Sequence, residues 1–354
     1  MMDGFTYTGL PARVIFGSGT TGQLPAEAER LGLTRALVLT TPPQAAQGEA
    51  LTALLADKAA GLFAEATMHT PVDVTQAALR FYHDTGADSV VSIGGGSTIG
   101  LGKAIALQTD CPQIVLPTSY AGSEMTPIIG QTEAGRKTTQ RTPKVLPETV
   151  IYDVDHTLSL PALMTVTSGM NAIAHAVEAL YAEEANPVLS LMAEDGVAKM
   201  GAALAAIRDA PEDVGVRSDA LYGAWLCAIC LGSGGVALHH KLCHVLGGSF
   251  DLPHAETHTI VLPHALAYNA PAVPDAMSAL RRATGSQSPA AALYDLAMTG
   301  GAPMALKNLG MPEDGIDRAI EITLENPYFN PRPLEAGALR NLLQNAWSGQ
   351  RPAA

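Results

Sequence analysis

Short apolar runs rich in β-branched residues alternate with helix-like stretches along residues 1–157. The runs RVIFGSG, RALVLTTP, SVVSIGGGS and QIVLPTS each end in glycine, proline or serine, which is typical of buried strands. Segments with helical periodicity, such as VTQAALRFYHDTGA, lie between these runs. Strands and helices in alternation predict a parallel α/β sheet.

From about Leu158 the pattern changes to long segments rich in alanine, leucine and methionine. SGMNAIAHAVEALYA and SLMAEDGVAKMGAALAAI are examples, and their spacing is typical of amphipathic or buried helices. We therefore expect an α/β domain over residues 1–157 and an all-helical domain over residues 158–354. No internal repeat interrupts this division.

Composition and net charge limit the functions that this chain can have. With 354 residues, 47% hydrophobic and 16% charged, the chain is long enough and apolar enough for two globular domains. A formal net charge of −13 argues against general nucleic-acid binding. No apolar run reaches the roughly 18–20 residues of a membrane span, and the start of the chain lacks signal-peptide features. We expect a cytoplasmic protein without a membrane partner.

The chain has four cysteines, Cys111, Cys227, Cys230 and Cys243. All lie in apolar surroundings, so we expect reduced core residues. Cys227 and Cys230 form a C-x-x-C inside LYGAWLCAICLGSGG, without a second pair. This context favours helix packing over a redox or zinc role.

A glycine-rich turn follows the run SVVSI and precedes the helix-like segment TIGLGKAIAL. The turn consists of Gly94, Gly95, Gly96 and Ser97. Glycines let backbone N–H groups approach a pyrophosphate, and a helix N-terminus favours its negative charge. A tight turn without a ligand is the alternative interpretation. The next run ends in Thr118 and Ser119, so polar turns at two consecutive strand ends predict one ligand-binding crevice.

The run RALVLTTP ends in Thr40 and Thr41. Dinucleotide-binding folds often place an acidic residue there, which binds the adenosine ribose. Hydroxyls discriminate poorly between a ribose 2′-hydroxyl and a 2′-phosphate. We therefore expect both NADH and NADPH to serve as cofactor.

Histidines gather in one part of the sequence: six of the ten lie between His239 and His264. His240 and His244 are four residues apart and so share one helical face. His254 follows after a glycine pair. A single histidine on such a helix is more often a buried core residue than a ligand.

A second helix-like segment carries Asn171 and His175, again four residues apart. The spacing allows His175, His240 and His254 to converge, as in a transition-metal site. Such a site usually includes a carboxylate, whereas Asn171 offers only a neutral carbonyl. We expect a degenerate site of Asn171, His175, His240 and His254 that does not require metal and instead donates protons and binds anions.

Four segments together resemble the iron-containing alcohol dehydrogenase family. YDVDHTLSLPALMTVTSGMNAIAHAVEALYA and HHKLCHVLGGSFDLPHAETHTIVLPH resemble its two signatures, and GGGSTIGLGKA and PTSYAGSEMTP resemble its cofactor motifs, which include Thr126. The resemblance covers nearly the whole chain. It implies a dehydroquinate synthase-like fold, with a Rossmann-like NAD(P)-binding domain, a C-terminal helical domain and the active site in the cleft between them. It also implies a homodimer.

Two positions depart from the family pattern. Gly100 stands where the family usually has aspartate in G-G-G-S-x-x-D, and Asn171 stands at the first metal-ligand position. These departures, with the late segment NPYFNPRP, are similar to a subgroup that acts in the breakdown of aromatic rings. The subgroup reduces the C=C bond of a small dicarboxylate in which the alkene is conjugated to a ketone.

The resemblance also implies roles for single residues. His175, His240 and His254 match the remaining ligand positions, His244 matches an additional catalytic-region histidine, and Lys137 matches a lysine that contacts the cofactor. Hydride addition to the alkene would leave an enolate, which needs charge stabilisation and a proton donor. We expect His244 and Tyr328 in these roles, with His175, His240 and His254 at the enolate oxygen or a carboxylate.

Two of the residues in the late segment have open alternatives. Tyr328 is equally compatible with a structural aromatic residue in a proline-rich loop. Arg332 in the same loop is a further candidate, as the partner of a substrate carboxylate.

Three other functions remain open on this evidence. A metal-dependent alcohol dehydrogenase or a lyase on the same scaffold would require a complete metal site, which Asn171 disfavours. A non-catalytic NAD-binding protein would have no use for the histidines at these spacings.

Overall fold

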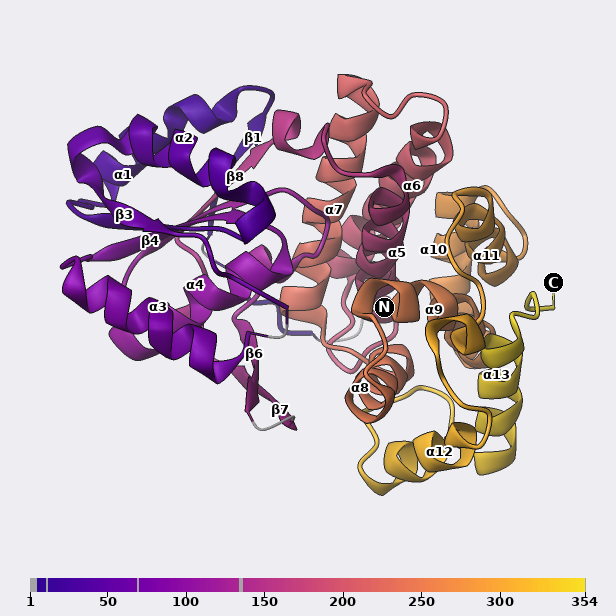
Figure 1. The fold of residues 1–354 in the computed structure, drawn as a ribbon. Helices are drawn as coiled ribbons and strands as arrows, with labels where there is room; N and C mark the ends of the chain where they lie inside the picture. The colour runs from indigo at the N-terminus through magenta and orange to yellow at the C-terminus, as the bar shows by residue number, and fades with distance from the viewer. Residues whose placement is uncertain (1–4, 11, 69, 134–135, 354) are drawn as a thin grey trace. The chain divides into compact units, whose positions relative to one another are not determined.

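The computed structural model describes residues 5–10, 12–68, 70–133 and 136–353, without the side chains of residues 132–138. The chain forms two compact units, Leu10–Leu160 and Pro161–Ala354, and residues 5–9 belong to the second (Figure 1).

The unit Leu10–Leu160 is built on a six-stranded sheet in the order β1-β8-β5-β4-β2-β3, in which all neighbouring strands are parallel. The strands are β1 (Arg13–Gly17), β2 (Ala36–Leu39), β3 (Ala59–Phe63), β4 (Ser89–Gly94), β5 (Gln113–Pro117) and β8 (Thr149–Asp153). A separate antiparallel pair consists of β6 (Ile128–Glu133) and β7 (Arg136–Arg141). The parallel sheet confirms the α/β class predicted from the alternating runs.

Helices cover both faces of this sheet because the strands are apolar on both sides. The helices are α1 (Leu24–Arg30), α2 (Ala45–Leu55), α3 (Val72–Asp84) and α4 (Gly96–Thr109). Val38 of β2 belongs to the core formed with α1 and α2, whereas its neighbours Leu37 and Leu39 belong to the core formed with α3 and α4. Figure 1 shows α1 and α2 on one face and α3 and α4 on the other.

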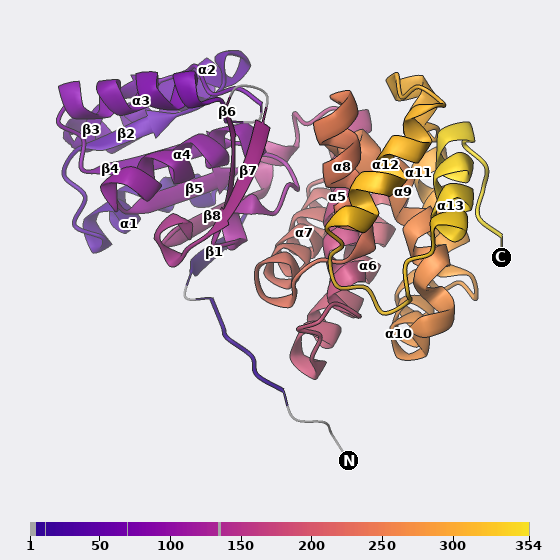
Figure 2. The same cartoon turned by 90° about the horizontal axis from the view of Figure 1, so that it is seen from below.

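The unit that begins at Pro161 is helical. Its helices are α5 (Ala162–Ala179), α6 (Pro187–Ile207), α7 (Val214–Gly234), α8 (Leu238–Phe250), α9 (His254–Asn269), α10 (Pro274–Thr284), α11 (Pro289–Thr299), α12 (Gly315–Glu325) and α13 (Ala336–Ser348). Figure 2 shows them in the second view. Asn186 and Asp213 accept backbone N–H bonds at the starts of α6 and α7, which satisfies donors that have no partner inside the helix.

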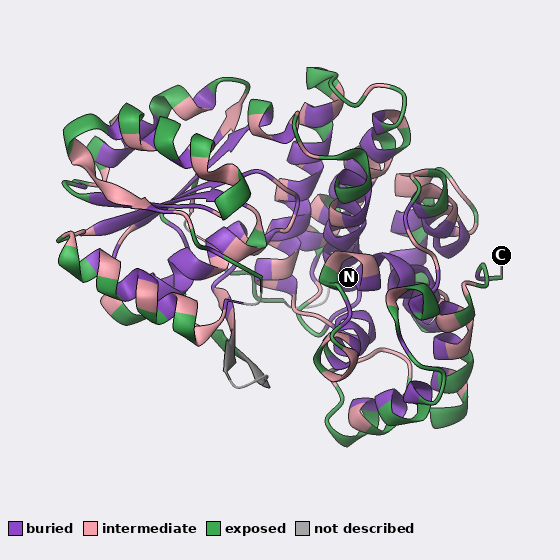
Figure 3. Cartoon of the chain, in the orientation of Figure 1, coloured by how far each residue is buried: buried purple, intermediate pink, exposed green. Residues whose placement is uncertain are grey.

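The helices α5, α6 and α7 pack against one another at the centre of this unit. Gly223 on α7 permits the close approach, because a Cβ atom there would lie 2.8 Å from the backbone nitrogen of Met200 on α6. By length and composition alone α7 would pass as a membrane span, but half of its apolar window is buried within the protein. The burial pattern in Figure 3 is that of a core helix.

All four cysteines are buried free thiols, as the sequence predicts, and Cys227 and Cys230 belong to the packed side of α7.

Candidate active site

The turn after β4 leaves no room for side chains. Gly94 has φ of 152°, a conformation that favours glycine, and a Cβ atom there would lie 2.4 Å from Thr98 Oγ1. A Cβ atom on Gly95 would lie 2.9 Å from Ser119 Oγ, on the turn after the neighbouring strand β5. No hydrogen bond from a described side chain caps the N-terminus of α4. A helix N-terminus without a side-chain cap, next to bare glycine backbone, fits the pyrophosphate of a dinucleotide.

Gln44 connects the ends of strands β2 and β5 near this turn. Its Nε2 donates to Thr118 Oγ1 at 3.0 Å, and its Oε1 accepts from Thr41 Oγ1 at 3.2 Å. The backbone N–H of Thr118 donates to the Gly94 carbonyl at 3.1 Å. Gln44 was not predicted from the sequence, because a glutamine after two prolines matches no cofactor motif.

Two of the predicted cofactor residues, Thr40 and Thr126, form hydrogen bonds within the protein. Thr40 is fully buried, and its hydroxyl donates to the Ile93 carbonyl at 3.0 Å, so this side chain holds the sheet together. Thr126 is 2% exposed, and its hydroxyl accepts from Lys103 and donates to the Ser123 carbonyl. Both hydroxyls therefore have partners within the protein, and their contact with a cofactor stays a prediction. The side chain of Lys137 lies outside the described residues.

Lys103 of α4 anchors the segment that follows β5. Its buried Nζ donates to the carbonyls of Ser123, Thr126 and Ile128 at 2.6, 2.7 and 2.8 Å, and to Thr126 Oγ1 at 3.0 Å. Burial lowers the pKa of this ammonium to about 7, against the attraction of Glu124. Four oxygen acceptors around one nitrogen support the charged form.

The space around position 100 explains why this residue is glycine. A Cβ atom at this position would lie 2.4 Å from Thr70 Oγ1, so the side chain of Thr70 fills the space that a larger residue would need. An aspartate, which the family usually has here, does not fit without movement of Thr70.

In the helical unit, the carboxylate of Glu178 on α5 organises the start of α8. It accepts backbone N–H bonds from Ala237 at 2.7 Å, from His239 at 2.6 Å and from His240 at 3.3 Å. It also accepts a bond from His240 Nδ1 at 2.6 Å. With the proton on Nδ1, His240 presents a lone pair at Nε2. Glu178 was not predicted from the sequence.

Asn171 and His175 project from α5 towards this histidine. The His175 ring stacks on the His240 ring, with centroids 5.2 Å apart and planes at 25°. Asn171 Oδ1, His175 Nδ1 and His240 Nε2 are buried and have no hydrogen-bond partner among the described residues. Burial, with the neighbouring His240, lowers the pKa of His175 well below its ordinary value. His175 is therefore neutral near pH 7 and can hold an anion only by donating an N–H bond.

The structure brings His244 and Tyr328 together. His244 lies one turn after His240 on α8, and its Nδ1 is 3.1 Å from the Tyr328 hydroxyl. Burial and the negative charge of Glu178 raise the pKa of Tyr328, so its phenol is neutral. His254 begins α9 and is exposed, with its ring centroid 4.2 Å from that of His258.

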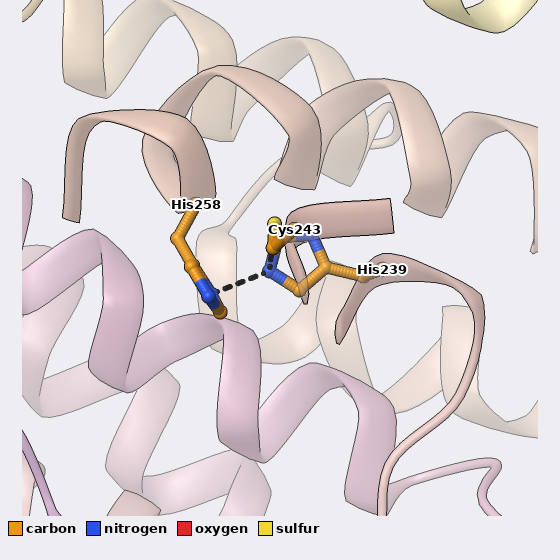
Figure 4. Close-up of side chains that lie close together, drawn as sticks. All are labelled: His239, Cys243 and His258. Carbon is orange, nitrogen blue, oxygen red and sulfur yellow. Dashed lines mark hydrogen bonds between the residues drawn. The ribbon is translucent and has the colours of Figure 1, made fainter. Parts of the chain in front are cut away.

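A second histidine cluster, drawn in Figure 4, consists of His239, Cys243 and His258. His239 Nε2 is 2.9 Å from His258 Nδ1 and 3.8 Å from Cys243 Sγ, and all three side chains are buried. Their atom types suit a zinc-like ion. The nitrogen–nitrogen distance is, however, that of a hydrogen bond. The His258 ring packs against the rings of His240 and His254, with centroids 5.0 and 4.2 Å away, so we interpret the cluster as support for those two residues.

The types of ligand atom show whether the site of Asn171, His175, His240 and His254 suits the divalent metal implied by the family resemblance. Asn171, His175, His240 and His254 supply oxygen and nitrogen atoms of the types that divalent transition metals bind. None of the four carries a negative charge, and the nearby carboxylate of Glu178 is used by α8 and His240. The four residues therefore offer ligand atoms that suit a divalent metal ion, but they supply no negative charge to balance it.

Arg332 contacts α9. Its Nη1 donates to the Tyr268 carbonyl at 2.7 Å, and its guanidinium lies 4.2 Å from the centroid of the Tyr268 ring. These contacts fix the loop after α12 to α9. The pairing of Arg332 with a substrate carboxylate stays a prediction.

Comparisons with known proteins match nearly the whole chain. The model of the family described as iron-containing alcohol dehydrogenase matches residues 11–154, and the model of the C-terminal part of the Fe-containing alcohol dehydrogenase family matches residues 165–347. The chain is 55% identical to the maleylacetate reductase of Rhizobium sp. strain MTP-10005, over 99% of this chain and all of that one.

Two solved structures extend the comparison. The crystal structure of maleylacetate reductase from Agrobacterium tumefaciens matches with a TM-score of 0.96 and 54% identity, covering 99% of this chain and 100% of that one. A putative alcohol dehydrogenase from Ralstonia eutropha JMP134 matches with a TM-score of 0.98 and 57% identity over the same shares.

Proposed function

This chain belongs to the iron-containing alcohol dehydrogenase family, and we propose that it reduces the C=C bond of maleylacetate with NADH or NADPH, giving 3-oxoadipate. The observation that carries the proposal is the identity to maleylacetate reductases above half of all positions along nearly the whole chain. The neutral Asn171 at the first ligand position supports it, because reduction of an activated alkene depends less on a metal than alcohol oxidation does.

The glycine turn of residues 94–97 would hold the cofactor pyrophosphate at the N-terminus of α4. Ser119 borders the turn on the neighbouring strand end, and Thr118 is held in place by Gln44. The end of β2 carries no carboxylate that would repel a 2′-phosphate, which supports the use of both cofactors. When bound, the cofactor supplies a hydride to the alkene carbon β to the ketone.

The residues of α8 and the loop after α12 would manage the charge and the proton. As negative charge moves to the ketone oxygen, a nearby N–H or O–H group stabilises it most strongly if it is already oriented. The bond between His244 and Tyr328 provides such orientation. His244 would donate the proton that completes the reduction, and Tyr328 would donate a hydrogen bond to the enolate oxygen.

His175, His240 and His254 would bind the enolate oxygen or a substrate carboxylate through neutral N–H groups. We propose that turnover does not require metal. If a divalent ion binds, Asn171, His175, His240 and His254 would hold it, and its chemistry would be polarisation of the ketone oxygen.

We also propose that the enzyme works in the cytoplasm as a homodimer, without nucleic-acid or membrane partners. The net charge of −13 and the acidic pI of about 5.1 support the absence of nucleic acid.

Comparison of three substrates tests the proposal. Purified enzyme should consume NADH with maleylacetate, and much more slowly with 3-oxoadipate, which has the ketone but no alkene, or with a simple aldehyde. Chromatography should identify 3-oxoadipate as the product. Rapid reduction of the aldehyde without reduction of maleylacetate would instead favour a metal-dependent alcohol dehydrogenase; the Ralstonia protein is named a putative alcohol dehydrogenase.

A further inference from the structure

Lys241 is a buried cation beside the residues proposed for catalysis. It directly follows His240 on α8 and is 8% exposed. Its Nζ lies over the ring of Tyr328, 5.4 Å from the centroid. Tyr328 is the residue whose hydroxyl bonds to His244. One aromatic ring thus connects an ammonium on its face with an imidazole at its hydroxyl.

The charge of Lys241 has no adequate partner in the part of the chain that the structure describes. Its ammonium forms no hydrogen bond or ion pair there, although the carboxylate of Glu325 attracts it from a greater distance. Most of the Lys241 side chain is buried, but its Nζ is not among the fully buried polar atoms without a partner, so a ligand from solvent can reach it. A nearby anion from outside the chain would satisfy it.

Two other basic residues of this unit, Arg332 and His175, are less suited than Lys241 to bind an anion. Arg332, in the same loop, is bound to the carbonyl and ring of Tyr268. His175 is buried and neutral. Among Lys241, Arg332 and His175, Lys241 is therefore the residue whose positive group has no bonded partner in the described part of the chain.

We propose that Lys241 binds a carboxylate of the substrate and thereby gives the site its preference for dicarboxylates. This inference rests on the proposed function only for the name of the substrate. A carboxylate beside the ring of Tyr328 would form a charge-assisted hydrogen bond with the ammonium, and it would place the conjugated ketone near His244 and Tyr328. Lys241 thus sets specificity, and the proton still comes from His244.

The first test is the Lys241→Met variant, which keeps the length of the side chain and removes its charge. The KM for maleylacetate should rise about thirtyfold or more, as expected for the loss of one charge-assisted pair, while the dissociation constant for NADH stays unchanged. Lys241→Arg should recover part of the loss. Lys307→Met is a matched control, because Lys307 lies 5.5 Å over the ring of Trp347 but is exposed on the short helix Leu306–Leu309.

A second measurement compares ligands with one and two carboxylates on enzymes with and without the positive charge at position 241. Adipate has two carboxylates and no reducible bond, and its monomethyl ester has one carboxylate. Calorimetry on the NADH complex should show that wild-type enzyme prefers adipate to the ester by about tenfold or more and that Lys241→Met abolishes this preference. Equal preference in wild type and variant would overturn the proposal.

This second measurement does not depend on turnover. If wild-type enzyme binds adipate through Lys241 but does not reduce maleylacetate, the proposed reaction fails and the carboxylate site stands. If maleylacetate is reduced and Lys241→Met retains both its KM and its preference for adipate, the carboxylate site fails and the reaction stands. Unchanged NADH affinity in each variant confirms that the protein is folded.

Discussion

His244 Nδ1 lies 3.1 Å from the hydroxyl of Tyr328, although the two residues are 84 positions apart in the chain. The contact joins α8 to the loop after α12. It gives each residue a fixed partner: the phenol orients the imidazole, and the imidazole orients the hydroxyl. A pair held in this way can deliver a proton and stabilise an oxyanion without reorganisation.

The first prediction concerns this pair. His244→Ala should lower kcat by about 10²–10⁴-fold, as expected for a lost general acid. Tyr328→Phe should lower kcat less, by about 10–100-fold, because the imidazole remains. Steady-state kinetics with saturating NADH would measure both. Tyr222→Phe on α7 is the control, since its phenol also has a hydrogen-bond partner, Asp195, and should leave kcat unchanged.

The second prediction concerns the glycine turn. A valine at position 95 would place its Cβ atom 2.9 Å from Ser119 Oγ and its methyl groups where phosphate must approach. Gly95→Val should weaken NADH binding at least tenfold, or by ~1.4 kcal/mol. Fluorescence titration with NADH would measure the change. Gly201→Ala on α6, where a Cβ atom meets nothing within 4 Å, should bind NADH like wild type. Unaltered affinity in a folded Gly95→Val protein would refute the phosphate assignment.

The third prediction concerns metal. Because Asn171, His175, His240 and His254 include no anionic ligand, prolonged chelation should leave most of the activity, and purified enzyme should contain metal well below one ion per chain. Asn171→Asp should raise zinc affinity by about tenfold or more without raising kcat. Elemental analysis and activity assays on the same samples would decide. Loss of turnover on chelation, with recovery on addition of Zn²⁺ or Fe²⁺, would make these residues essential metal ligands.

The fourth prediction concerns acid stability. Burial alone would raise the pKa of Asp153, but the bonds that it accepts from Thr21 Oγ1 at 2.5 Å, Thr21 N at 2.8 Å and Asp155 N at 3.1 Å hold this pKa below its ordinary value. Its stabilising contribution is therefore complete above the unfolded-state pKa of about 3.9 and is lost as the pH falls through the lower folded-state pKa.

Replacement of Asp153 by asparagine should accordingly flatten the dependence of unfolding free energy on pH below about 4, as measured by urea denaturation. The exposed residue Asp57 offers the matched control, Asp57→Asn, which should keep the wild-type slope. An equal slope in Asp153→Asn and wild type would show that the hydrogen bonds at the end of β8 do not carry this effect.

The fold could be predicted from the sequence largely because the sheet is buried on both faces. The runs that form β1, β2, β4 and β5 are short, apolar and closed by turn residues, and the alternating helices imply parallel pairing. Strand β3 was not predicted because it is an edge strand of sequence AAGLF, partly exposed and poor in β-branched residues. The hairpin of β6 and β7 was also not predicted, since its residues are mostly polar.

The site could be predicted only where spacing carries information. The i, i+4 pairs pointed to the histidines, but Glu178 is one glutamate in a long helix, and its bonds to the start of α8 depend on packing. Thr40 was assigned to the cofactor because it ends a strand, yet its hydroxyl turns to the carbonyl of Ile93 within the sheet. Lys241 and Lys103 are buried cations in apolar segments, and sequence patterns do not show which oxygen atoms or rings surround them.

The position of the transferred hydride tests the central claim most directly. Maleylacetate should be reduced with NADH that carries deuterium at the transferable position, and the 3-oxoadipate formed should be analysed by NMR. The two former alkene carbons lie between the ketone and the distal carboxylate. The account predicts deuterium on the one next to that carboxylate, which is β to the ketone, and a proton from solvent on the one next to the ketone. Deuterium on a carbinol carbon, from reduction of the ketone itself, would contradict the account.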